Sequence, residues 1–139
     1  MGNELISVRE PDTNTLGAML RFKRPEGSRT ERYFIKRFLM PLGMQADKRG
    51  NIIKAIGDNP SVLWSCHTDT VHNGGGADQK MRYENGIIKL ADGSKSNCLG
   101  ADDTAGVWLM REMILCNIPG LYVFHHGEEK GGIGSKFIA

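Results

Sequence analysis

Hydrophobic residues recur at helical spacing in three stretches of the chain, at 13–22, 29–39 and 103–114. The spacing predicts an amphipathic helix in each stretch. The second is preceded by the sequence SRTE at 28–31, which has the pattern of a capping box and predicts where that helix begins. Residues 132–139 have the composition of the first turns of a further helix.

Strand-like patterns alternate with these helices. The runs at 52–56, 62–66 and 121–124 predict strands, and the last two are apolar enough for strands buried on both faces. A hairpin is predicted at 81–90 because Asn85-Gly86 separates two short apolar runs. Alternating helices and strands predict an α/β fold, with a mixed, mostly parallel central sheet between helical layers.

Composition narrows the class of protein. A chain of 139 residues forms one domain. A net charge of +2 is too small to indicate nucleic acid or an anionic membrane as a partner, and no apolar run is long enough to cross a membrane. Three cysteines, an odd number in unrelated contexts, indicate free thiols in a reducing compartment. We therefore expect a soluble cytoplasmic protein.

A histidine and an aspartate, His67 and Asp69, follow directly after the strand predicted at 62–66. Ligand sites in open α/β sheets lie at the carboxyl ends of strands. Residues two apart in an extended segment point the same way, so Asp69 could accept a hydrogen bond from His67 and leave its other ring nitrogen for a metal. Taken alone, such a pair is more often a surface histidine and aspartate in a loop.

Two pairs of adjacent carboxylates follow. Asp102 and Asp103 stand where a helix begins, and Glu128 and Glu129 follow the strand predicted at 121–124. Helix capping accounts for one aspartate, and paired glutamates are common on surfaces. One carboxylate can also bridge two cations, while of two glutamates one can bind metal and the other remove a proton from metal-bound water. The three groups, in this order and each at the end of an element, predict a two-metal hydrolase site.

With these motifs, the chain resembles the N-terminal part of the co-catalytic zinc exopeptidases, the superfamily of peptidase T, carboxypeptidase G and the bacterial leucyl aminopeptidases. Their pattern is His-x-Asp, then Gly-x-x-Asp or Gly-Ala-Asp-Asp, then Glu-Glu-x-Gly. The segment LGADDTAG at 99–106 is most similar to the peptidase T branch. The likeness covers nearly the whole chain and implies a three-layer α-β-α catalytic domain.

The resemblance also implies a role for each matched residue. It makes His67, Asp102 and Glu129 metal ligands, with Asp102 bridging two zinc ions, for which cobalt or manganese could substitute. Asp69 would orient His67, and Glu128 would be the general base. Asp103 would follow Asp102 across a peptide bond that is typically cis. The implied reaction is attack of a bridging water on the carbonyl of a peptide or an N-acyl amino acid.

Some features depart from that pattern. Thr104 stands where many relatives have Lys or Arg, and His72 where many have Pro. Relatives also have a later carboxylate ligand and a final histidine, and many insert a lid or dimerisation domain. We therefore expect residues 1–139 to be the N-terminal part of a catalytic domain, with two protein ligands per metal and the lid domain absent. Whether the protein forms a homo-oligomer stays open.

Two functional hypotheses follow. The chain is either a fragment or short form of a zinc-dependent exopeptidase or amidohydrolase, with little activity by itself, or a non-catalytic truncated homologue with weak metal binding. A plain α/β binding domain with coincidental carboxylates is disfavoured by the order of the motifs. His72, His125 and His126 are expected to support the structure rather than to bind metal, although one of them could replace a missing ligand.

Overall fold

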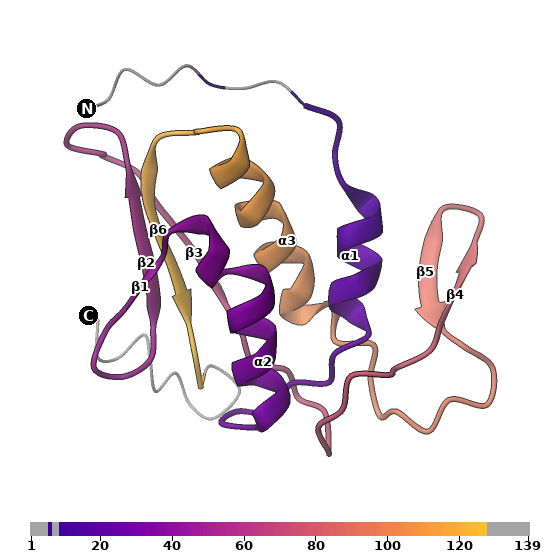
Figure 1. Ribbon diagram of the computed structural model, residues 1–139. Coiled ribbons are helices and arrows are strands. Elements are labelled where there is room, and N and C mark those ends of the chain that lie inside the picture. Colours follow the sequence, from indigo (N-terminus) through magenta and orange to yellow (C-terminus); the bar gives the residue numbers. More distant parts are fainter. Residues whose placement is uncertain (1–5, 7–8, 128–139) are drawn as a thin grey trace.

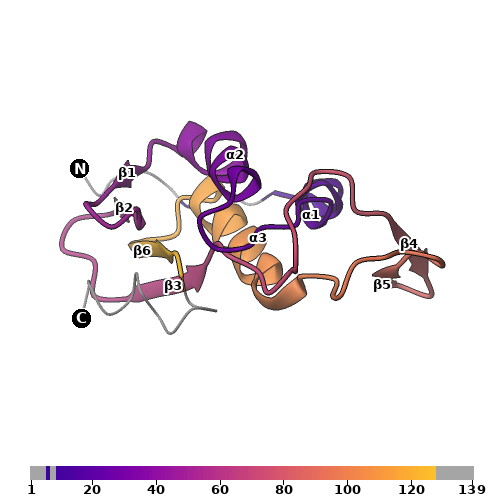
Figure 2. The same cartoon turned by 90° about the horizontal axis from the view of Figure 1, so that it is seen from below.

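The computed structural model describes residue 6 and residues 9–127 of the chain. A four-stranded sheet forms one side of the molecule, α2 and α3 lie against the same face of it, and α1 packs beside α3 (Figures 1 and 2). In chain order the elements are α1 (Thr13–Leu20), α2 (Arg29–Phe38), the short 3-10 helix η1 (Met40–Leu42), β1 (Gln45–Ala46), β2 (Ile52–Ile56), β3 (Leu63–His67), β4 (Met81–Glu84), β5 (Ile87–Leu90), α3 (Ala101–Leu115) and β6 (Gly120–His125).

The predicted helices form, and capping residues define where two of them begin. The Asp12 carboxylate accepts the main-chain N–H of Thr15 at 3.0 Å and so caps α1. Ser28 Oγ accepts the N–H of Glu31 at 3.1 Å and caps α2, as the sequence predicts. The reciprocal half of the capping box is displaced by one residue, because the Glu31 carboxylate accepts the N–H of Gly27 at 2.8 Å.

The sheet is mixed, with the strand order β1-β2-β6-β3. β1 with β2 and β2 with β6 are antiparallel, and β3 with β6 is parallel. The α/β class and the mixed sheet are confirmed, but among the described strands the expected mostly parallel arrangement is wrong. The reason is the short turn at 57–62, which reverses the chain between β2 and β3. Since β6 inserts between these two strands, it is antiparallel to one and parallel to the other.

The prediction that both apolar strands are buried on both faces holds for most of β6 and only partly for β3. Tyr122, Val123 and Phe124 of β6 are buried, whereas Leu121 is 36% exposed. In β3, Cys66 is buried, whereas Leu63 is 59% exposed. β3 is an edge strand among the described residues, so its apolar run is less covered than a central strand would be.

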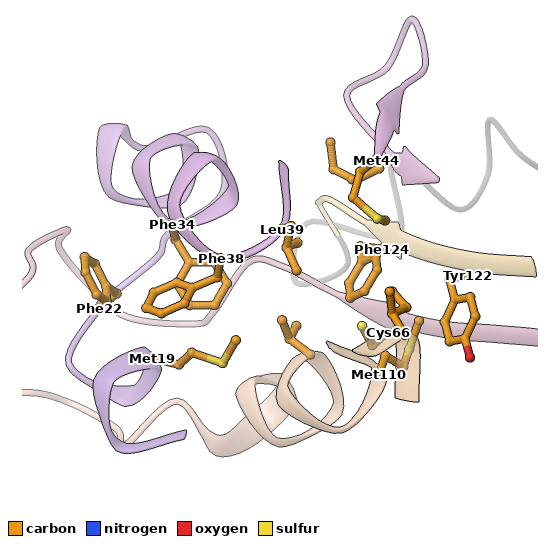
Figure 3. Packing of buried hydrophobic residues seen from close by; sticks show 13 residues of the cluster. Met19, Phe22, Phe34, Phe38, Leu39, Met44, Cys66, Met110, Tyr122 and Phe124 are labelled. Carbon is orange, nitrogen blue, oxygen red and sulfur yellow. The ribbon is translucent and has the colours of Figure 1, made fainter. Parts of the chain in front are cut away.

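The hydrophobic core lies between the helices and the sheet (Figure 3). Rings from α2 and from the segment after α1 pack together, with centroid distances of 5.0 Å between Phe34 and Phe38 and 5.7 Å between Phe22 and Phe38. Phe124 reaches the same core from β6. No helix within the described part of the chain is long and apolar enough to cross a membrane.

The predicted hairpin forms a separate two-stranded sheet, β4-β5, which stands away from the main sheet (Figure 1). Its turn residues, Asn85 and Gly86, have φ angles of 51° and 77°, as a tight hairpin turn requires. After β3 the chain leaves the main sheet, forms this hairpin and returns to the main sheet at the beginning of α3. The carboxyl end of β3 and the beginning of α3 therefore lie side by side, and this is where the predicted site residues fall.

Candidate metal site

His67 is the last residue of β3 and is only 7% exposed. Its ring Nδ1 lies 2.8 Å from the main-chain carbonyl oxygen of Asp69 and 3.4 Å from the Asp69 carboxylate. Because a carbonyl can only accept, Nδ1 carries a proton and donates it. Sequence reasoning expected the carboxylate to orient the imidazole, whereas in the structure the carbonyl of the same residue is the nearer acceptor.

The other ring nitrogen faces Asp102. His67 Nε2 lies 2.9 Å from Asp102 Oδ1, and the Asp102 side chain is 83% exposed. Burial disfavours the charged imidazole, but hydrogen bonds with Asp69 and Asp102 and the nearby carboxylate charges outweigh it, raising the pKa of His67 to about 9. Without a metal, this pair is therefore an imidazolium with a carboxylate. A divalent cation between the same two atoms would take the place of that proton.

Asp103 fixes the beginning of α3 rather than facing outward. The peptide bond between Asp102 and Asp103 is cis, as the resemblance implied. The Asp103 carboxylate accepts the N–H of Gly106 at 3.1 Å and the main-chain N–H of His67 at 3.4 Å. A Cβ atom at position 106 would overlap this carboxylate, so the glycine leaves the space that Asp103 occupies.

Two buried charged residues that the sequence did not single out support this region. Glu31 is 4% exposed and accepts a hydrogen bond from Thr68 Oγ1 at 2.7 Å. Burial raises the pKa of Glu31, against the lowering effect of its hydrogen bonds with Thr68 and Gly27. Arg24 is 0% exposed, and its Nε–H donates to the main-chain carbonyl of Thr68 at 2.8 Å. In the sequence Glu31 belongs to the capping box at 28–31 and Arg24 to the short basic segment RFKR at 21–24, and neither pattern indicates burial.

The other described histidines have protein partners. His72 is buried, and its Nδ1 accepts the hydroxyl of Thr70 at 2.7 Å. Its Nε2 lies 2.9 Å from both Gln79 Oε1 and the carbonyl of Cys98, and burial lowers the pKa of His72. The imidazole is therefore neutral, with its proton on Nε2. His126 Nδ1 lies 3.3 Å from the Glu26 carboxylate.

The predicted base Glu128 and the predicted ligand Glu129 lie outside the described residues. Within residues 6 and 9–127, no group of three or more His, Cys, Asp or Glu side chains is arranged to hold a metal ion. The structure brings together two of the three predicted ligands, His67 and Asp102. Their donors, an imidazole nitrogen and a carboxylate oxygen, are the kinds that zinc takes in proteins, so the described part of the site fits that ion.

No protein-family model and no curated protein matches the chain. The chain does match solved structures. A tripeptidase from Staphylococcus aureus subsp. aureus Mu50 has a TM-score of 0.71 and 25% identity, and the match covers 89% of this chain and 38% of that one. Aminopeptidase PepT from Bacillus cereus ATCC 10987 has a TM-score of 0.67 and 26% identity, with the same two coverages.

Aminoacylhistidine dipeptidase from Vibrio alginolyticus has a TM-score of 0.63 over 96% of this chain and 31% of that one. Since the identity is 16%, this likeness shows the fold alone. The tripeptidase and PepT confirm the resemblance predicted from the sequence, because the chain shares its fold with both of these peptidases at 25% and 26% identity. The chain spans 38% of the length of each of them.

Proposed function

We propose that this chain carries part of the active site of a metal-dependent exopeptidase of the peptidase T type, acting on short peptides or N-acyl amino acids in the cytoplasm. The observation that carries the proposal is the meeting of His67 Nε2 and Asp102 Oδ1 at 2.9 Å, where β3 ends and α3 begins. This pair lies in a fold shared with two solved peptidases. Residues 1–139 form the N-terminal part of the catalytic domain in this proposal.

In this proposal, four of the described residues bind the metal or position its ligands. His67 and Asp102 supply one donor each. Asp69 holds the His67 ring through its carbonyl at 2.8 Å, which keeps the proton on Nδ1 and leaves Nε2 for a cation. Asp103 fixes the start of α3 and so limits the positions that Asp102 can take.

Zinc is the proposed ion, two per complete site, with cobalt or manganese as substitutes. Bound there, it would act as a Lewis acid that polarises the scissile carbonyl and lowers the pKa of water. In the proposal, Glu129 supplies a further donor, and Glu128 accepts a proton during attack on the substrate.

The alternative is a non-catalytic relative that binds metal weakly. It is favoured by one observation, that only two ligand side chains converge among the described residues. A structural zinc site usually has four protein ligands and a catalytic one three, so two donors alone should bind weakly.

An assay of di- and tripeptide hydrolysis distinguishes the exopeptidase from the non-catalytic relative. The protein is expressed from its natural reading frame, through to the stop codon. With zinc, cobalt or manganese, we expect turnover that a chelator abolishes. Glu128→Gln should remove nearly all of it and leave the metal content unchanged, because the substitution keeps the shape and removes the base. Glu84→Gln, a matched change at a glutamate of the separate β4-β5 hairpin, should retain turnover. Metal binding without any turnover would support the non-catalytic alternative.

A further inference from the structure

Arg24 lies between α1 and α2 and is 0% exposed. Arginine is almost never fully buried unless it is paired, so this position needs an explanation. The guanidinium carbon lies 3.9 Å from the centre of the Phe34 ring. Burial lowers the pKa of Arg24 to about 10, opposed mainly by the carboxylates of Glu31 and Asp69, so the side chain is charged at neutral pH.

The guanidinium group makes hydrogen bonds to three different segments. Its Nε–H donates to the carbonyl of Thr68 at 2.8 Å, and one terminal nitrogen donates to Thr104 Oγ1 at 2.7 Å. The other terminal nitrogen donates to the carbonyl of Phe22 at 3.1 Å and, at 3.4 Å, to that of Met19. One planar group thus joins the end of α1, the loop after β3 and the beginning of α3.

The main chain of Arg24 binds the same loop after β3. Its N–H donates to Thr70 Oγ1 at 2.9 Å, and its carbonyl accepts the N–H of Thr70 at 2.7 Å. Arg24 therefore holds the residues on both sides of Asp69, through Thr68 and Thr70. Asp69 in turn holds the ring of His67.

At the other end, Arg24 reaches the segment that carries Asp102. Thr104 Oγ1 uses its own proton to bind the carbonyl of Gly100 at 2.5 Å, and it accepts the hydrogen bond from Arg24 with a lone pair. Gly100 and Thr104 flank residues 101–103. The hydrogen bonds from Arg24 through Thr104 to Gly100 therefore fix both ends of the turn that presents Asp102.

We propose that Arg24 is a positioning residue, which sets the separation of His67 and Asp102 by tying the loop after β3 to the beginning of α3. A lysine could not do this equally well, because it lacks the rigid fork that directs separate N–H groups to Thr68 and Thr104. The importance of this role for catalysis rests on the proposed function. The geometry itself concerns the metal-free protein and can be tested there.

The test compares Arg24→Lys with Thr104→Val, which removes the other half of the same contact. Thr104→Ser keeps the hydroxyl and should behave like the parent chain. Arg111→Lys is the matched control, since Arg111 is a half-buried arginine whose Nε–H donates to the carbonyl of Phe38, away from His67. If Arg24→Lys does not fold, Thr104→Val alone decides, because it leaves the buried guanidinium and its other partners in place.

The first readout is NMR of the metal-free chain. We expect Arg24→Lys and Thr104→Val to shift the ring ¹⁵N resonances of His67 and to weaken the nuclear Overhauser contact between its ring and Asp102. The shifts in the double variant should be smaller than the sum of the two single ones, because both substitutions remove the hydrogen bond between Arg24 and Thr104. Thr104→Ser and Arg111→Lys should give parental spectra. A folded Arg24→Lys or Thr104→Val with unchanged His67 resonances would overturn the proposal.

The second readout is affinity for cobalt, added as Co²⁺ alone. Loss of a group that orients metal ligands typically costs about 10–100-fold in metal affinity, and we expect a loss in that range for Arg24→Lys and Thr104→Val. If the parent chain binds no cobalt, the proposed function fails while the NMR comparison still decides the role of Arg24. Parental affinity in the folded variants, together with unchanged His67 resonances, would assign Arg24 to the stability of the core alone.

Discussion

The two ring nitrogens of His67 have different partners, and this division decides what the residue can do. Nδ1 donates to the carbonyl of Asp69 at 2.8 Å, while Nε2 faces the exposed carboxylate of Asp102 at 2.9 Å. The period of two along a strand predicted that His67 and Asp69 point the same way. It could not predict that the carbonyl would be nearer than the carboxylate, since this depends on how the chain turns after β3.

This geometry predicts different effects for the two aspartates. Asp69→Asn keeps the nearer acceptor, the main-chain carbonyl at 2.8 Å, and neutralises the carboxylate at 3.4 Å, so we expect cobalt affinity to fall by about tenfold, the low end for groups that orient ligands. Asp102→Asn removes the negative charge of a proposed ligand and leaves a single, weaker carbonyl donor, so it should cost considerably more. Isothermal titration with cobalt measures both. A larger loss for Asp69→Asn than for Asp102→Asn would contradict the assignment.

Tyr122, in the centre of the sheet, predicts a loss of stability in alkali. Burial raises the pKa of its hydroxyl, which donates to the carbonyl of Ile118, to about 12. The folded state therefore favours the neutral phenol. Its contribution is intact below the unfolded pKa near 10 and is lost as the pH rises from there to 12, at up to about 1.4 kcal/mol per pH unit.

Urea unfolding between pH 9 and 12 tests this. Tyr122→Phe should flatten the decline over this range, because phenylalanine has no proton to lose. Tyr33→Phe is the control, since Tyr33 is 54% exposed and should leave the pH profile unchanged. Equal effects of the two substitutions would show that the decline has another origin.

At the scale of elements, local signals in the sequence predicted more than long-range ones. The capping box predicted the beginning of α2, and Asn85-Gly86 predicted the β4-β5 hairpin, because both depend on contacts between residues close in sequence. The direction of neighbouring strands was not predictable in this way, since it depends on β6 inserting between β2 and β3. Arg24 was missed for the same reason: Thr104, its partner, is 80 residues away.

The first turn of α3 gives a prediction that opposes ordinary helix propensity. Replacing glycine by alanine inside a helix usually stabilises it by up to about 1 kcal/mol. At position 106 the added Cβ would overlap the Asp103 carboxylate, so we expect Gly106→Ala to destabilise the fold by about 1–3 kcal/mol. Chemical denaturation measures the change. Gly74→Ala, where nothing lies within 4 Å of the added atom, should change stability by less than about 1 kcal/mol.

At the scale of the whole molecule, the fold is that of larger peptidases, and the chain spans 38% of the length of two of them. The sequence predicted this relationship because its motifs stand in a fixed order at the ends of elements. It predicted the position of His67 beside Asp102 for the same reason. Two of the predicted ligands, His67 and Asp102, converge among the described residues, and an ion held by two protein donors would be bound weakly.

We therefore predict that residues 1–139 alone hydrolyse di- and tripeptides negligibly with added zinc or cobalt. Catalysis needs a firmly held metal, a base and groups that stabilise the oxyanion, and two donors provide only part of the first. Release of amino acids, measured against a metal blank, is the assay. Robust turnover by residues 1–139 that Glu128→Gln abolishes would show that other groups complete the site.

The most direct test of the central claim, that His67 and Asp102 together hold a divalent metal, is a cobalt titration followed by visible absorption. The parent chain should show d–d bands as cobalt binds to nitrogen and oxygen donors, with weak affinity. His67→Ala should abolish these bands. His126→Ala, which changes a histidine that contacts Glu26 instead, should retain them. Bands that persist in His67→Ala and disappear in His126→Ala would contradict the account.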